Sequence, residues 1–87
     1  MTDSYYEVVV YTRDGCGPCA ATKAYLRKYE INFAEINTTN NPMVADALIE
    51  QGYRELPVVE WNVNGDQGAW TGHRSDDLEA LKYLIHG

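Results

Sequence analysis

The 87-residue sequence has only two cysteines, three prolines and one phenylalanine, and it contains no long apolar run. A membrane-spanning helix needs about 20 consecutive apolar residues, so we expect no membrane span. The first four residues lack the basic and apolar regions of a secretory signal, so we expect a cytoplasmic protein. In a reducing compartment, two cysteines in a CxxC motif indicate catalysis or metal binding more than a structural disulfide.

Basic residues are also scarce, with 7 Lys and Arg against 13 Asp and Glu and a formal net charge of −6. A protein that follows a phosphate backbone needs a basic stripe, so nucleic acid is not an expected partner. The hydrophobic fraction of 45% is too high for a disordered chain. Because the chain is too short for two cores, we expect one domain over residues 1–87, acting as a monomer.

Apolar patterning predicts four strands and three helices. Segments rich in β-branched and aromatic residues predict strands at 5–11, at 32–37, at 58–61 and, after the Asn64-Gly65 turn, through Ala69 and Trp70. Helical spacing and capping residues predict helices at 18–29, at 42–52 and after Ser75. The order β-α-β-α-β-β-α predicts an α/β fold in which a parallel crossover and an antiparallel hairpin share one four-stranded mixed sheet flanked by helices.

Two details of this pattern are specific enough to test. Three consecutive valines at 8–10 are typical of a strand covered on both faces. In the last helix, Ser75 is expected to cap the N-terminus, and Leu78, Leu81 and Ile85 are expected to face the core.

The sequence Cys16-Gly17-Pro18-Cys19 directly follows the first strand and opens a helix. Free backbone N–H groups and the helix dipole at this position lower the pKa of the Cys16 thiol, which makes Cys16 the attacking nucleophile. One helical turn brings Cys19 close enough to resolve a mixed disulfide. Pro18 stiffens the loop, and Gly17 leaves room for a protein disulfide to approach. These features predict a redox-active dithiol.

A metal site is the alternative interpretation of the two cysteines. Tetrahedral zinc would need His73 and His86 as well, or a second chain. These histidines lie 13 positions apart, from 73 to 86, unlike the short spacing of most zinc ligands. We therefore expect no metal and no bound cofactor.

Three further residues have two interpretations each. Pro57 is either a cis proline in a tight turn into the sheet or a trans proline that opens a strand, and local sequence alone favours trans. His73 is either a proton donor to a leaving thiolate or a solvated loop residue. Trp70 is either a packing residue or part of a binding surface.

Three segments resemble known redoxins. Residues 11–19 (Tyr-Thr-Arg-Asp-Gly-Cys-Gly-Pro-Cys) resemble the opening strand and active loop of glutaredoxin-sized proteins, and Gly52-Tyr53 with residues 56–59 (Leu-Pro-Val-Val) resembles their cis-proline segment. Residues 70–76 (Trp-Thr-Gly-His-Arg-Ser-Asp) resemble the Trp-Ser-Gly-Phe-Arg-Pro-Asp segment of the NrdH redoxins, which are glutaredoxin-like in fold and thioredoxin-like in behaviour. The likeness runs from about Val8 into the last helix.

This resemblance implies a thioredoxin-like fold of the glutaredoxin type and a dithiol–disulfide oxidoreductase. It further implies that the protein donates electrons to class Ib ribonucleotide reductase or other protein disulfides, and that thioredoxin reductase re-reduces it with NADPH. By the same resemblance, Cys16 attacks, Cys19 resolves and a cis Leu56–Pro57 bond lies beside them. The residues that it implies for substrate binding are Arg13, Trp70, Thr71, Gly72, His73, Arg74 and Asp76.

The chain departs from the family pattern at two places. Gly17-Pro18 is the thioredoxin pair, which favours a reducing potential near the roughly −270 mV of thioredoxin itself. Glutathione-dependent glutaredoxins carry two glycines where this chain has Gly72 followed by His73 and Arg74.

A glutathione-dependent glutaredoxin remains the nearest alternative function. A thioredoxin-fold binding module, such as one that bridges an iron–sulfur cluster, is the alternative of another class, although the complete CxxC disfavours it.

Overall fold

The computed structural model describes residues 5–87, and its elements follow the order predicted from the sequence. The elements are β1 (Tyr6–Thr12), α1 (Gly17–Lys28), β2 (Ala34–Asn37), the 3-10 turn η1 (Thr38–Asn40), α2 (Pro42–Glu50), β3 (Val58–Val63), β4 (Asp66–Thr71) and α3 (Ser75–His86). Within the described residues, no helix is long and apolar enough to cross a membrane.

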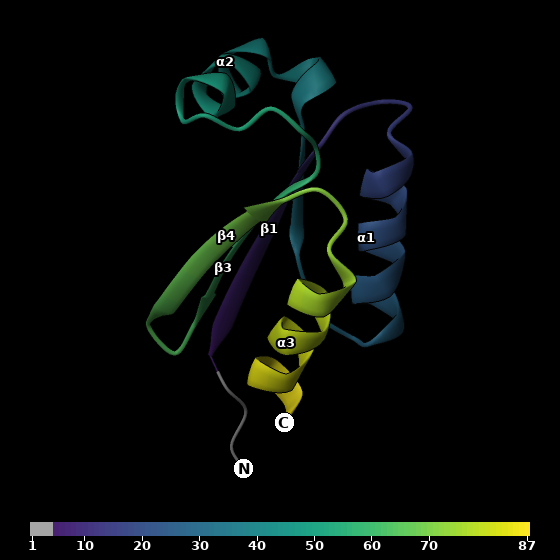
Figure 1. The fold of residues 1–87 in the computed structure, drawn as a ribbon, viewed down its shortest axis with the longest axis vertical. Coiled ribbons are helices and arrows are strands. Elements are labelled where there is room, and N and C mark those ends of the chain that lie inside the picture. The colour runs from purple at the N-terminus through teal and green to yellow at the C-terminus, as the bar shows by residue number, and fades with distance from the viewer. Residues whose placement is uncertain (1–4) are drawn as a thin grey trace.

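The four strands form one mixed sheet in the order β2-β1-β3-β4 (Figure 1). β1 pairs with β2 in parallel, and β3 pairs antiparallel with both β1 and β4. The register places Val10 opposite Glu35 of β2 and opposite Val59 of β3, and Val59 opposite Trp70. The predicted parallel crossover and antiparallel hairpin are therefore confirmed.

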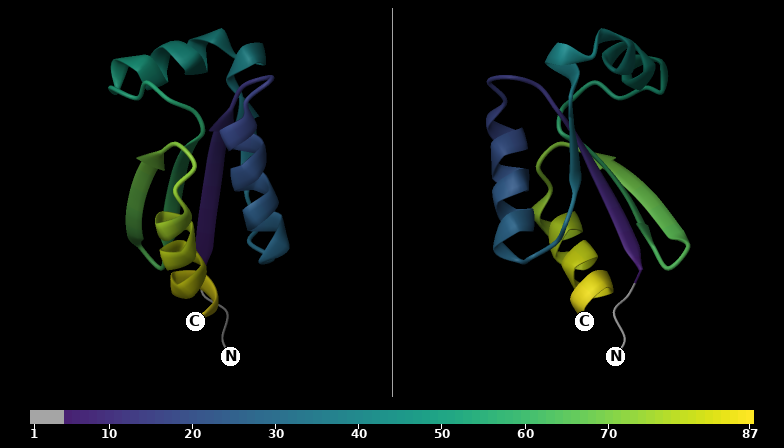
Figure 2. Two further views of the ribbon diagram at one scale, coloured as in Figure 1. Left: turned by 45° about the vertical axis from the view of Figure 1, so that its right-hand side comes forward. Right: turned by 180° about the vertical axis from the view of Figure 1, so that it is seen from behind.

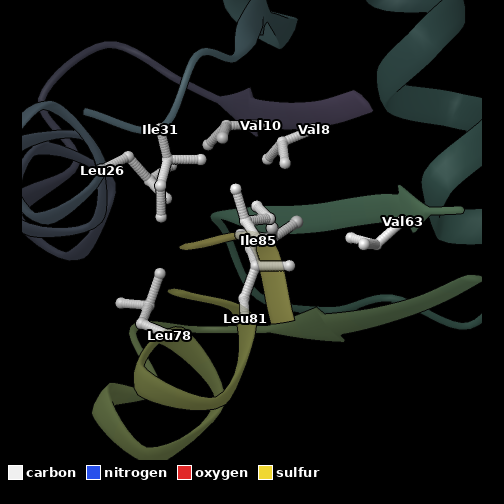
Figure 3. Packing of buried hydrophobic residues seen from close by; sticks show 9 residues of the cluster. Val8, Val10, Leu26, Ile31, Val63, Leu78, Leu81 and Ile85 are labelled. Carbon is white, nitrogen blue, oxygen red and sulfur yellow. The ribbon is translucent and has the colours of Figure 1, made fainter. Parts of the chain in front are cut away.

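The core lies between the sheet and the helices α1 and α3, which cover the same face (Figure 2). Alternation along β1 turns Val8 and Val10 toward these helices, where they are 3% and 0% exposed. Figure 3 shows leucines of α1 and α3 converging on these valines. Leu78, Leu81 and Ile85 are 0%, 1% and 7% exposed, so the predicted inner face of the last helix is confirmed.

Two local expectations need correction. Val9 points away from α1 and α3 and is only half-buried, because α2 lies beyond one end of the sheet and leaves much of this second face uncovered (Figures 1 and 2). Ser75 is the first residue of α3, and Arg74 is the N-cap, with extended backbone and no side-chain capping bond. A Ser75 cap would start the helix at Asp76, so the helix begins one residue earlier than expected.

Trp61 serves packing, as a strand tryptophan often does. It lies on the helix-facing side of β3, opposite Gly68 of β4, and packs against the core. A Cβ atom at Gly68 would lie 2.6 Å from the indole ring, so the absence of a side chain there makes room for Trp61.

Candidate active site

Cys16 occupies the N-terminus of α1, where its sulfur meets a free backbone donor. Its backbone is extended (φ −99°, ψ 106°), and its Sγ accepts a hydrogen bond of 3.1 Å from the backbone N–H of Cys19. Pro18 stands in the first turn, where the absence of its N–H has no cost. A donor of this kind stabilises a thiolate at Cys16 over the thiol.

Cys16 and Cys19 are joined in a disulfide, with their Cα atoms 5.2 Å apart. Cys16 is 8% exposed and Cys19 is 2% exposed, while Gly17 and Pro18 between them are exposed. An incoming disulfide therefore reaches Cys16 before Cys19. The geometry suits attack by Cys16 and resolution by Cys19.

The cis-proline segment lies beside this pair although it is 40 positions away in the sequence. The Leu56–Pro57 peptide bond is cis, as the resemblance implied, and Pro57 is buried. The carbonyl oxygen of Leu56 lies 3.8 Å from the Sγ of Cys16. The expectation that Leu56 lies against the cysteine loop is confirmed.

The connection between β4 and α3 is bound to the cis-proline segment and to α1. The Thr71 hydroxyl donates to the Glu55 carbonyl at 2.6 Å, and the Gly72 N–H donates to the Pro57 carbonyl at 2.8 Å. Gly72 has φ +88°, a conformation that L side chains rarely adopt. The next residue, His73, places its Nδ1 2.9 Å from the hydroxyl of Thr22 in α1.

The structure does not bring the whole predicted substrate-binding segment to the cysteines. Trp70 is half-buried against the core, and it lines a hollow beside α3 rather than the one at Cys16. Its indole nitrogen is buried without a hydrogen-bond partner among the described residues. Arg74 pairs with the exposed Asp76 at 3.6 Å and with Asp77 at 3.5 Å, within the first turn of α3. Trp70 therefore lies beside α3 and not in the hollow that contains the cysteines.

A polar network that sequence reasoning missed holds the loop before Cys16. The Asp14 N–H donates to the hydroxyl of Thr39 at 3.0 Å, and the Asn37 amide donates to the Asp14 carboxylate at 2.8 Å. The Thr38 hydroxyl donates to the Thr12 carbonyl at 2.8 Å. β2 and η1 therefore fix the chain just before the nucleophile. Only the parallel pairing of β1 with β2 reveals these contacts, because the partners are more than 20 positions apart in the sequence.

A second missed group, Glu35, lines the same hollow as the cysteines, together with Arg13 and Lys23. Its carboxylate accepts hydrogen bonds from the Thr12 hydroxyl at 2.7 Å and from the Lys23 ammonium at 2.9 Å. These two bonds, the Thr12 bond first, hold the pKa of Glu35 below its usual value. Lys23 follows Cys19 by four residues on α1, so the two side chains lie on the same face of the helix. This spacing is the one sequence signal that places Lys23, and with it the Lys23–Glu35 pair, near the cysteines.

The lowered pKa of Glu35 predicts an acid-sensitive contribution to stability. Because the folded pKa lies below the unfolded value of 4.5, the contribution is present above about pH 4.5 and is lost as pH falls through the folded pKa. With the side chain 30% exposed, we expect Glu35→Gln to cost roughly 1 kcal/mol at neutral pH and less near pH 3. Urea unfolding at several pH values measures this. Glu50→Gln, at the exposed end of α2, is the control, and a Glu35→Gln deficit that does not shrink in acid would contradict the assignment.

The residues of the alternative zinc site are not gathered together. In residues 5–87 no three His, Cys, Asp or Glu side chains form a group that could hold a metal ion. His73 precedes α3 and His86 is its last residue, so the 12-residue helix separates them by about 18 Å. The Nε2 of His86 instead lies 3.3 Å from the Glu30 carbonyl.

Comparison with known proteins agrees with this geometry. Residues 8–66 match the glutaredoxin family model. The chain is 39% identical over 79 residues to the glutaredoxin-like protein NrdH of Escherichia coli K12, covering 91% of this chain and 93% of that protein. It is 35% identical over 74 residues to the NrdH protein of Lactococcus lactis subsp. cremoris, covering 85% and 97%.

Comparison with solved structures supports the assignment of the fold. The NrdH-redoxin of Escherichia coli superposes with a TM-score of 0.75 at 39% identity, over 86% of this chain and 93% of that chain. Thioredoxin f2 of Chlamydomonas reinhardtii, at 24% identity and a TM-score of 0.63, shares the fold alone. The thioredoxin-like fold is thus confirmed, and the intact CxxC pair identifies a thiol–disulfide oxidoreductase. The chain belongs to the glutaredoxin family and, within it, to the NrdH glutaredoxin-like redoxins.

Proposed function

We propose that this redoxin reduces protein disulfides with electrons from NADPH that thioredoxin reductase supplies, and that a class Ib ribonucleotide reductase is its main acceptor. The observation that carries the proposal is the position of Cys16. Its sulfur lies at a helix N-terminus, accepts a backbone N–H, and stands beside the carbonyl of Leu56 at the exposed end of α1. A nucleophile at the edge of the molecule suits a macromolecular disulfide.

Each turnover transfers two electrons. The Cys16 thiolate attacks one sulfur of the substrate disulfide, and the other substrate sulfur leaves as a thiolate and takes up a proton. Cys19 loses its proton and attacks the Cys16 sulfur, which releases the second substrate thiol. The products are the reduced substrate and the Cys16–Cys19 disulfide seen in the structure. The reductase then returns two electrons from NADPH and restores the dithiol.

Two observations support a flavoprotein reductase over glutathione. His73 and Arg74 are exposed where glutathione-dependent glutaredoxins have small residues, so we expect their side chains to leave less room for a tripeptide. The Gly17-Pro18 loop favours a potential near that of thioredoxin, roughly −270 mV. If the reduction potential of a dithiol lies about 30 mV below that of the glutathione pool, the equilibrium constant for its reduction by glutathione is roughly tenfold smaller than at equal potentials.

The test supplies the oxidised protein with NADPH and either thioredoxin reductase or glutathione with glutathione reductase. The acceptors are insulin and the disulfide form of a cysteine-containing tail peptide of a class Ib ribonucleotide reductase. We expect NADPH consumption with thioredoxin reductase and little or none with glutathione, with Cys16→Ser as the blank. Efficient turnover with glutathione and none with thioredoxin reductase would contradict the partner assignment and favour a glutathione-dependent glutaredoxin. It would leave the roles of the cysteines intact.

A further inference from the structure

The loop between β4 and α3, residues 72–74, is joined to the cysteine-bearing helix through one side chain. The Nδ1 of His73 lies 2.9 Å from the hydroxyl of Thr22, which stands three residues after Cys19 on α1. Thr22 is 0% exposed, whereas His73 is exposed. The contact therefore connects a surface loop to the buried side of α1, directly below the cysteine pair.

This contact has no substitute within the described residues. The other polar contacts of the loop are the Gly72 hydrogen bond to the cis-proline segment, and the backbone hydrogen bond and ion pairs of Arg74 with the first turn of α3. Of the hydrogen bonds in residues 5–87, only the His73–Thr22 bond joins this loop to α1. Without it, the loop would stay attached at Pro57 but would be free on the side that faces α1.

The chemistry of the pair suits a structural bond. The Thr22 hydroxyl can donate to Nδ1 or accept from it, so it pairs with either tautomer of the neutral ring. A fully buried hydroxyl needs a partner, and the imidazole supplies one. His73 is therefore neither free in solvent nor, with Nδ1 occupied, fully available for proton transfer.

We propose that His73 is a positioning residue for protein substrates, which holds the 72–74 loop against α1 at the edge of the site. The inference rests on the dithiol activity of Cys16 and Cys19 and is independent of which reductase reduces their disulfide. Around Cys16, Gly17 and Pro18 are exposed and the Leu56 carbonyl lies 3.8 Å from the sulfur. The 72–74 loop is bonded to the adjoining Pro57 carbonyl through the Gly72 N–H. The position of this loop sets how well a protein surface fits around the disulfide.

The test measures steady-state reduction of insulin, with dithiothreitol as the electron donor so that no reductase is needed. We expect His73→Ala to raise the KM for insulin about fivefold, which is ~1 kcal/mol at 1.4 kcal/mol per factor of ten, and to change kcat by less than about twofold. Thr22→Val removes the same bond from the other side. The double variant should show no further rise in KM, because both substitutions remove one interaction.

Two variants separate positioning from general damage to the fold. In His73→Asn the side-chain oxygen lies close to the position of Nδ1, so we expect this variant to restore most of the lost affinity. His86→Ala removes the other histidine, at the far end of α3, and should leave the KM unchanged. Nitrogen chemical shifts of the His73 ring report the bond directly and should change in Thr22→Val.

Three results would overturn the inference. They are an unchanged KM in His73→Ala, additive effects of the two single substitutions, and failure of His73→Asn to restore affinity. None of these bears on the proposed electron source. Conversely, failure of thioredoxin reductase to recharge the protein would not change the insulin KM measured with dithiothreitol.

Discussion

Replacement of Cys16 by serine will reduce the rate of disulfide reduction to that of the reaction without protein. Cys16 is the more exposed of the two cysteines and the one whose Sγ accepts a hydrogen bond from the backbone N–H of Cys19, so it carries the stabilised thiolate. A serine hydroxyl is not ionised near neutral pH and cannot attack a disulfide. Insulin reduction at a fixed concentration of reductant measures the loss.

Replacement of Cys19 by serine should give a different result from the same assay. The first attack still occurs, but the mixed disulfide at Cys16 cannot be resolved, so the protein accumulates covalently bound to its substrate. Mass spectrometry of the trapped complex should identify Cys16 as the attachment point. Circular dichroism of both variants serves as the control, because serine differs from cysteine by one atom and should preserve the fold. Faster alkylation of Cys19 than of Cys16 near neutral pH would reverse these roles.

Replacement of Leu78 by alanine should cause the largest loss of stability that we predict. Leu78 is 0% exposed where α3 meets α1 and the sheet (Figure 3). Truncation of a buried leucine costs about 2–5 kcal/mol, because transfer energy is lost and a cavity remains. A domain of this length has roughly 4–13 kcal/mol in total, at about 0.05–0.15 kcal/mol per residue, so the variant loses a large share of its stability. Urea unfolding should show a clearly lower midpoint.

Leu84 offers a matched control on the same helix. It is 46% exposed, so Leu84→Ala removes the same atoms from a site that is already half in water. We expect it to cost less than about 1 kcal/mol. Equal losses in Leu78→Ala and Leu84→Ala would contradict the assignment of the core to the space between α1, α3 and the sheet.

Much of the active site is local in sequence and was therefore predictable from it. Cys16, Pro18 and Cys19 lie within one helical turn, and the strand before them and the helix after them are defined by nearby apolar patterning. The hairpin at Asn64-Gly65 and the inner face of α3 also depend on neighbouring residues. Backbone hydrogen bonding and side-chain periodicity act over a few residues, so these features follow from short segments.

Only the tertiary structure decided which distant residues surround the cysteines. Leu56 reaches Cys16 across 40 positions, and His73 reaches Thr22 across 51. Trp70 turned toward the core rather than the site, because the register opposite Val59 puts it on the helix-facing side of β4. Strand register also explains the contact between Glu35 and Lys23, because Glu35 lies opposite Val10 and therefore faces α1. Such contacts depend on strand register and on how helices pack across the sheet, and a shift of one residue in register reverses the face on which a side chain lies.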